Sequence, residues 1–230
     1  MTTNNTGSVA KRYAQLETDR SPFLERAREA AELSIPTLMP PKGHTGSTDY
    51  PTPYQSIGAR GVNNLASKLL MTLLPPNAPF FRLTMDDFDV QNIAGEGARG
   101  KVEEALGRIE RAAMQEVETK AIRVPVFEAI KQLIVAGNVL VHMPKEGGVR
   151  VFRLDRYVCQ RDAMGNVLEI IIKETVSPQM LPQKVKELLT KPDEEQQFKN
   201  VDLYTHVKRV GKKWEVYIAE AMSGVFPIER

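Results

Sequence analysis

The chain of 230 residues is poor in several features that mark particular classes of protein. Its one cysteine, Cys159, excludes an intrachain disulfide and fits a reducing compartment. No run approaches about 18 apolar residues, so the sequence predicts no membrane-spanning helix. The first residues, MTTNNTGSVAKRY, lack the apolar core of a secretory signal. Neither sign of charge dominates, with 31 Lys and Arg against 29 Asp and Glu, and this balance argues against a dedicated nucleic-acid-binding protein.

Motifs for metals and cofactors are also lacking. The three histidines are scattered, and no Cys/His pair has the spacing of a zinc site. A small acidic group lacks the glycine and the distal glutamate of a calcium-binding loop. Cys159 falls in an alternating stretch and is interpreted as a small core residue. We therefore predict no metal site, no cofactor and no catalytic residue; the side chains considered for metal binding are His44, His142, His206, Asp86, Asp87 and Asp89.

What the chain does contain, in its first part, is the apolar periodicity of helices. Residues 9–19 predict one helix, and Ser21-Pro22 is expected to open a second, with Ser as N-cap and Pro at the first position. Pro36 is expected to end that helix. A loop over residues 36–53 follows, rich in Pro and Gly and longer than compact domains usually hold without a function.

Three further helices are expected before residue 138. The segment 57–74 carries a wide apolar stripe with Pro75-Pro76 after it, so we expect this helix to be mostly buried. The segment 124–138 has Pro125 near its start and Gly137-Asn138 as its C-terminal cap. The segment 101–121 carries one apolar stripe that we expect to be buried, made of Val102, Leu106, Ile109, Ala113 and Val117.

From Val139 the pattern changes to the alternation of strands. It predicts three hairpins, over 139–154, over 157–176 with a turn at Ala163–Asn166, and over 201–222 across Gly211. Three smaller predictions are a short strand at 80–85, a short helix at 177–190 and a linker at 190–200. The predicted fold class is α+β, with an N-terminal helical bundle at about 9–137 and a β-hairpin-rich region at about 138–222.

A glycine run at residues 95–101 has the letters of two phosphate-binding motifs. Gly95, Gly97 and Gly100 form G-x-G-x-x-G, and Gly95, Gly100 and Lys101 form G-x-x-x-x-G-K. Both motifs need a buried strand before the glycines, and the residues there, MDDFDVQNIA, are acidic. The P-loop also needs Ser or Thr after the lysine, where this chain has Val102. A mobile connector into a helix is the favoured interpretation, and a P-loop-like nucleotide site at Gly95–Lys101 is the less favoured one.

The loop segment HTGSTDY contains His44, Ser47 and Asp49, the residue types of a hydrolase triad. Triads assemble from distant segments, and no oxyanion-hole motif accompanies these residues. We favour a polar loop in which Ser and Asp bond nearby backbone.

The third hairpin combines basic and aromatic residues. Strands of this composition can bind single-stranded nucleic acid by stacking. A basic hairpin tip with aromatics on its buried face is the more common arrangement, and a nucleic-acid-binding module is the alternative. The residues are His206, Lys208, Arg209, Lys212 and Lys213, interleaved with Tyr204, Trp214 and Tyr217.

Four stretches resemble one family. STDYPTPYQSIGARGVNNLASKLLMTLLPP (47–76), VFEAIKQLIVAGNVLVHMP (126–144), VCQRDAMGNVLEIII (158–172) and ERAREAAELSIPTLMP (25–40) are similar to the portal, or head-to-tail connector, protein of T7-like short-tailed phages. The resemblance spans nearly the whole chain in the same order. It implies the wing of the portal, with 1–137 as its helical part and 138–230 as its β-rich part. The family's stem, clip and crown have no counterpart in this chain.

The resemblance implies a structural protein that is not an enzyme. Family members form a ring of twelve identical subunits at one capsid vertex, assembled in the host cytoplasm and retained in the virion. Double-stranded DNA passes through the ring without sequence-specific contacts during packaging and ejection. The implied protein partners are the major capsid protein, a scaffolding protein, the terminase packaging motor, the tail adaptor and internal core proteins; no membrane is implied. We expect the loop 36–53, with Tyr50 and Tyr54 near its end, to reach a neighbouring subunit.

Overall fold

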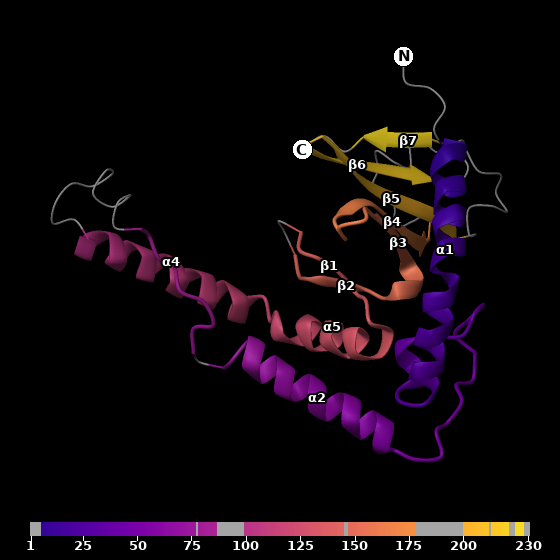
Figure 1. The fold of residues 1–230 in the computed structure, drawn as a ribbon, viewed down its shortest axis with the longest axis horizontal. Helices are drawn as coiled ribbons and strands as arrows, with labels where there is room; N and C mark the ends of the chain where they lie inside the picture. Colours follow the sequence, from indigo (N-terminus) through magenta and orange to yellow (C-terminus); the bar gives the residue numbers. More distant parts are fainter. Residues whose placement is uncertain are drawn as a thin grey trace. The chain divides into compact units, whose positions relative to one another are not determined.

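The computed structural model describes residues 6–76, 78–86, 99–144, 147–177, 200–211, 213–220 and 224–227 (Figure 1). Its helices precede its strands, which confirms the predicted α+β class. The helices are α1 (Thr6–Glu32), α2 (Ile57–Leu73), α4 (Arg99–Thr119) and α5 (Arg123–Ala136), with short 3-10 turns η1 (Pro36–Leu38) and η2 (Leu154–Arg156). The strands are β1 (Leu140–His142), β2 (Arg150–Phe152), β3 (Tyr157–Arg161), β4 (Val167–Val176), β5 (Val201–Val210), β6 (Lys213–Glu220) and β7 (Gly224–Pro227).

Two compact units make up the chain. The sheet unit combines Met1–Glu29 with Arg153–Arg230, and the helical unit is Ala30–Phe152. The change from helix to strand does occur near residue 137, because α5 ends at Ala136 and β1 begins at Leu140. The assignment of 1–137 and 138–230 to two parts of a wing stays a prediction.

The sheet unit is built on five antiparallel strands in the order β3-β4-β5-β6-β7. The predicted hairpins at 157–176 and 201–222 are confirmed in this sheet, and so are their turns. Gly165 between β3 and β4 has φ 85°, and Gly211 between β5 and β6 has φ 60°. Both angles lie in the left-handed region that glycine adopts without steric cost. Asp162 closes the first turn through its side chain, which accepts hydrogen bonds from the backbone N–H groups of Met164 and Asn166 at 2.9 and 2.8 Å.

Helix α1 covers one face of this sheet (Figure 1). The ring of Tyr13 meets that of Tyr204 edge to face, with centroids 5.3 Å apart, an arrangement that aromatic pairs favour. Burial raises the pKa of Tyr13, so its phenol stays neutral. The core at this contact consists of Val9, Tyr13 and Leu16 from α1 with Val158, Ile171 and Tyr204 from the strands.

The predicted break at Ser21-Pro22 is wrong, because α1 runs through Pro22 as one helix. A proline inside a helix removes one hydrogen bond and costs about 3 kcal/mol. The buried stripe of α1 continues across the proline with helical spacing, and each large apolar side chain that it buries contributes about 1.5–3 kcal/mol. Packing therefore outweighs the local stop signal. The stripe consists of Val9, Tyr13, Leu16, Arg20, Leu24 and Ala27.

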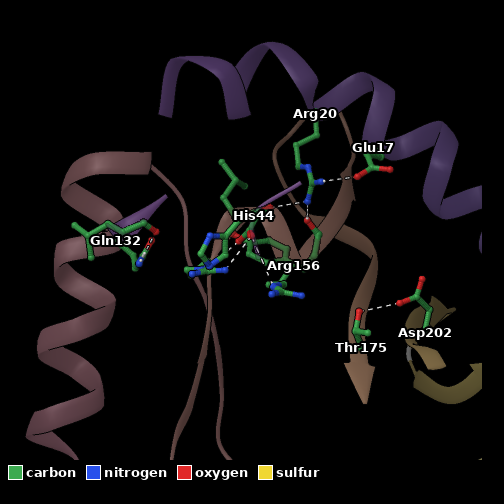
Figure 2. A network of polar contacts seen from close by, with 12 residues as sticks. Glu17, Arg20, His44, Gln132, Arg156, Thr175 and Asp202 are labelled. Atoms are coloured by element: carbon green, nitrogen blue, oxygen red, sulfur yellow. Dashed lines mark hydrogen bonds and ion pairs between the residues drawn. The ribbon is translucent and has the colours of Figure 1, made fainter. Parts of the chain in front are cut away.

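Arg20 is the charged member of that stripe, and its side chain is only 8% exposed. Its Nη1 donates a hydrogen bond to the carbonyl oxygen of Leu154 at 2.6 Å and another to that of Tyr157. Figure 2 shows Arg20 pointing from α1 toward these backbone groups while Nη2 pairs with Glu17 at 3.3 Å. A buried guanidinium bonded to carbonyl groups fixes the position of α1 against the start of β3.

In the helical unit, α2 packs against α5. Gly137 ends α5 as predicted, with φ 70° and its N–H bonded to the Leu133 carbonyl at 2.9 Å. Gln132 of α5 is 2% exposed and donates from Nε2 to the carbonyl of Leu38 at 3.1 Å, which holds η1 in place. Arg123 donates to the carbonyls of Leu74 and Pro75 at 3.2 and 2.9 Å, beyond the last turn of α2.

Three predictions for this unit need correction. The segment 80–85 is not a strand; it has no regular secondary structure, and Leu83 donates its N–H to Glu110 of α4 at 2.5 Å. Helix α2 is not mostly buried, since only Val62 and Ala66 are buried along it. Helix α4 has no buried residue, so its apolar stripe is not buried within the described chain. Periodicity predicts which face of a helix is apolar, but it does not show what covers that face.

Some predictions lie outside the described residues. They are the helix at 177–190 apart from its first residue, most of the linker at 190–200, and Gly95 and Gly97 of the glycine run. Among the described helices, none is long and apolar enough to cross a membrane.

Candidate functional site

Helix α2 presents large apolar side chains to solvent. Leu65, Leu69 and Leu73 follow one another at intervals of four residues, the spacing that keeps them along one strip of the helix. Leu65 is 47% exposed, although it belongs to the apolar stripe of segment 57–74 that we expected to be mostly buried. Several exposed apolar side chains on one helix are typical of an interaction surface. We call the exposed side chains of this helix the α2 surface; they are Ile57, Leu65, Leu69, Met71 and Leu73.

Helix α4 spans 21 residues without a buried one, but most of its apolar stripe is half-buried. Ile109, in the middle of its apolar stripe, is 56% exposed. Its other face carries ion pairs one turn apart, Arg99 with Glu103 at 3.0 Å and Arg108 with Glu104 at 2.7 Å. Exposed pairs of this kind contribute only about 0.3–0.5 kcal/mol each. The rest of the stripe, Val102, Leu106, Ala113 and Val117, is half-buried, so Ile109 is the large apolar side chain that this helix leaves exposed.

The triad residue types do not form a triad in the loop that the structure describes. The Tyr50 hydroxyl lies 3.2 Å from Nε2 of His44. The hydroxyl of Ser47 lies 3.1 Å from that of Thr45. His44, Ser47 and Asp49 are all exposed. These contacts are those of a polar loop.

The scattered histidines and acids do not meet either. His142 on β1 is exposed, and Cys159 on β3 is a free, half-buried thiol. Asp86 is exposed, while Asp87 and Asp89 lie outside the described residues. No group of three potential metal ligands occurs within the described ranges. Of the glycine run, the structure describes Gly100 and Lys101, which lie in the first turn of α4.

Of the three histidines, His206 has the most buried polar surroundings. Its Nε2 lies 2.7 Å from Oε1 of Glu169 on the neighbouring strand β4. Oε2 of the same carboxylate accepts a hydrogen bond from Nε of Arg12 on α1 at 3.0 Å, and a second nitrogen of Arg12 bonds Gln160. Glu169 is 6% exposed, so this carboxylate is buried and fully paired. We call Arg12, Gln160, Glu169 and His206 the polar cluster.

Burial lowers the pKa of His206, and the positive charges of Lys208 and Arg12 add to this effect. Glu169 opposes the shift but does not overcome it. The imidazole is therefore neutral near pH 7 and donates its Nε2–H to the carboxylate. The sequence singled out His206 but missed Glu169 and Arg12, which lie 157 residues apart in the chain. The only signal for Glu169 was a lone acid among isoleucines in VLEIII.

The tip of the β5–β6 hairpin carries the basic residues noted in the sequence. Lys208 pairs in register with Glu169 on β4 and with Glu215 on β6, and Arg209 pairs with Trp214. Trp214 is 47% exposed, while Tyr204 is buried beneath α1. The favoured prediction of aromatics on the buried face therefore holds for Tyr204 and not for Trp214. Lys212 lies outside the described residues.

Comparison with known proteins shows to which family the chain belongs. The family model described as bacteriophage head to tail connecting protein matches residues 6–223. The chain belongs to this family. The resemblance found in the sequence is thereby confirmed, and the connector family is one of structural phage proteins.

Relatives of this connector-family chain are portal proteins. It is 39% identical over 202 residues to the portal protein of Escherichia phage T7, an alignment that covers 85% of this chain and 38% of the relative. It is 40% identical over 201 residues to the portal protein of Enterobacteria phage T3, covering 85% and 37%. For the portal protein of Pseudomonas phage phiKMV the identity is 34% over 190 residues, covering 80% and 37%. The chain thus spans less than two fifths of the length of these relatives.

Proposed function

We propose that this chain is part of a portal subunit, and that the whole protein forms a ring at the capsid vertex through which double-stranded DNA is packaged and ejected. The observation that carries the proposal is the family match over residues 6–223, together with relatives that are portal proteins. A ring of twelve subunits, docking of the packaging motor, tail and capsid proteins, and assembly on a scaffolding protein belong to the same proposal.

The uncovered apolar faces support the assembly part of this proposal. Identical subunits in a ring contact each other through two different surfaces. Each subunit must therefore expose one contact surface to each of its two neighbours. The α2 surface and Ile109 of α4 provide apolar side chains that stay exposed within the described chain. Association would remove this area from water at about 25 cal/mol per Å².

The loop 36–53 is the second proposed contact. Leu38, Met39 and Pro40 anchor its start by burial, while residues 41–47 are exposed throughout. The side chain of Tyr54 is fully exposed. We propose that this exposed segment reaches a neighbouring subunit. Deletion of residues 42–50 should impair ring assembly, and unchanged assembly would refute this role.

Electron microscopy of the full-length protein tests the main proposal. Rings of identical subunits are expected from the unaltered protein. The double substitution of Leu65 and Leu69 to Lys should reduce the ring fraction, because it places charges on the α2 surface. The matched control substitutes Asn64 and Ser67 to Lys, which adds the same charge at exposed polar positions of the same helix. A full-length protein that stays monomeric, or that turns over a substrate, would contradict the proposed function; equal loss in both variants would contradict the role of the α2 surface alone.

A further inference from the structure

Residues 81–85, with the sequence FRLTM, alternate like a β-strand, although the described chain gives them no strand to pair with. Phe81 and Leu83 are half-buried. Arg82 and Thr84 are exposed. Alternation between a covered and an exposed face indicates an extended backbone. The strand pattern of the sequence is therefore present in the structure, and what is missing is a second strand to share its hydrogen bonds.

One edge of this segment is free. The N–H of Leu83 donates to Glu110 of α4 at 2.5 Å. Successive residues of an extended chain direct their N–H and C=O groups to opposite edges. The backbone groups of Arg82 and Thr84 therefore lie at the edge away from Glu110, and they form no hydrogen bond with another described residue. Unpaired backbone groups along an extended segment are a template for pairing with another chain.

An open groove of about 380 Å³ lies beside the segment. It is lined by residues 82–85 and by residues of α4 between Arg99 and Glu110. Val102 and Leu106 of α4 form an apolar part of this lining, and both are half-buried. The described chain thus leaves room next to the segment for the side chains of an added strand.

The two-stranded sheet of the helical unit has an open edge (Figure 1). Strand β1 pairs with β2 and with no other strand of the described residues. Strand β2 packs against α5, and its Phe152 is 8% exposed. On β1, Val141 is 41% exposed, and Met143, just after this strand, is 68% exposed. A strand edge that exposes apolar side chains and contains no lysine or proline to protect it is a template for a further strand.

We propose that residues 81–85 of one subunit add a third strand to β1 of the neighbouring subunit, an inference that rests on the proposed ring. A head-to-tail ring contact joins two different surfaces of the same chain, and the segment and the β1 edge are two such surfaces. Both belong to the helical unit, yet they do not pair with each other within the described chain. Pairing between subunits supplies each of them with hydrogen bonds that it lacks, which is the mode of recognition called strand addition.

The apolar faces of the two partners determine how they meet. Side chains two residues apart share a face of an extended chain, so Val141 and Met143 form one apolar row. The corresponding row on the segment consists of Phe81, Leu83 and Met85. A sheet that brings the two rows together on one face places His142 on the opposite face, together with Arg82 and Thr84.

Disulfide cross-linking of the full-length protein tests this pairing. Arg82→Cys and Thr84→Cys are each combined with His142→Cys in one chain. Opposed residues of neighbouring strands have Cα atoms about 4.5–5.5 Å apart, a distance that a disulfide spans. On oxidation, we expect one of the two double variants to form covalent oligomers larger than a dimer, because each subunit is linked to two neighbours. The matched control carries Val141→Cys in place of His142→Cys, projects its thiol from the other face, and should form about tenfold less of these oligomers.

A second pair of variants tests the backbone hydrogen bonds. Thr84→Pro removes one N–H from the free edge, whereas Thr84→Ala removes the side chain and keeps the N–H. In electron micrographs of the full-length protein, the ring fraction of Thr84→Pro should be about twofold or more below that of Thr84→Ala. Circular dichroism of both variants should be unchanged, since Thr84 is exposed and its N–H is unbonded within the described chain.

The outcomes separate this inference from the proposed function. Rings without the expected cross-link, links confined to monomers or dimers, or equal linking in the Val141→Cys control would overturn the strand pairing and leave the proposed function standing. Equal ring fractions for Thr84→Pro and Thr84→Ala would overturn the pairing in the same way. A full-length protein that forms no rings would contradict the proposed function and this inference together.

Discussion

The close contact at Gly58 allows the packing of the helical unit to be tested by a matched pair of substitutions. A Cβ atom added at Gly58 would lie 2.4 Å from the carbonyl oxygen of Leu33 and 3.1 Å from Cα of Ser34. Both are backbone atoms, so α2 or the segment after α1 would have to move. A Cβ added at Gly61, one turn further along α2, would meet nothing within 4 Å. Both glycines lie inside the same helix.

The expected magnitudes follow from this difference. Replacing a helical glycine with alanine gains about 1 kcal/mol of helix propensity at either position. Forcing a group into occupied space costs about 1–3 kcal/mol, and this cost applies only at Gly58. Gly61→Ala should therefore stabilise the protein by about 1 kcal/mol. Because the propensity gain cancels between the two variants, Gly58→Ala should be about 1–3 kcal/mol less stable than Gly61→Ala.

Thermal unfolding followed by circular dichroism measures this difference. For a chain of this size, 1 kcal/mol shifts Tm by about 2–4 °C, so the two variants should differ by about 2–12 °C. Hydrogen exchange of the α2 amides should locate the effect, with faster exchange in Gly58→Ala. Equal Tm values for the two variants, or a more stable Gly58→Ala, would refute the close approach of Leu33 to α2.

Three further predictions concern the sheet unit. Arg20→Met should lower the free energy of unfolding by about 2–5 kcal/mol in urea titrations, because the carbonyls of Leu154 and Tyr157 lose their donor; a loss no larger than that of the exposed Lys11→Met would contradict this. Pro22→Ala should raise stability by up to about 3 kcal/mol through the restored helical hydrogen bond, whereas an unchanged or lower Tm, compared with Ser21→Ala, would argue against a helix continuous through residue 22. The pKa of His206 is lowered from 6.5 in the folded protein, so the unfolded chain takes up this proton first as pH falls. The contribution of His206 to stability is complete above pH 6.5 and is lost as the pH falls from 6.5 to the pKa of the folded state. In urea titrations at a series of pH values, His206→Gln should reduce the slope of the free energy of unfolding against pH in this range. An unchanged slope would exclude His206 as the cause.

The polar cluster and the α2 surface show different limits of sequence analysis. The sequence identified His206 as one of the basic residues that combine with aromatic residues in the third hairpin. Arg12 lay in a segment interpreted only as helical, and no local pattern connected it with Glu169. The α2 stripe was identified correctly as apolar, and the error concerned its surroundings. Local patterns report the chemistry of a face, while pairing and burial depend on segments far away in the chain.

The sequence by itself determined the elements whose cause is local. Glycines with positive φ end α5 and form the turns of the β3–β4 and β5–β6 hairpins. The alternation of apolar and polar residues predicts β3 to β6, and the stretches quoted in the sequence analysis identify the connector family. Only the tertiary structure decided that α1 continues through Pro22, that Arg12 and His206 share Glu169, and that the apolar face of α2 is exposed. The physical reason is the separation along the chain over which each effect acts. Turns and periodicity depend on the φ and ψ preferences of neighbouring residues. Burial is a sum over contacts between distant segments, and it can outweigh the cost of about 3 kcal/mol that a proline imposes inside a helix.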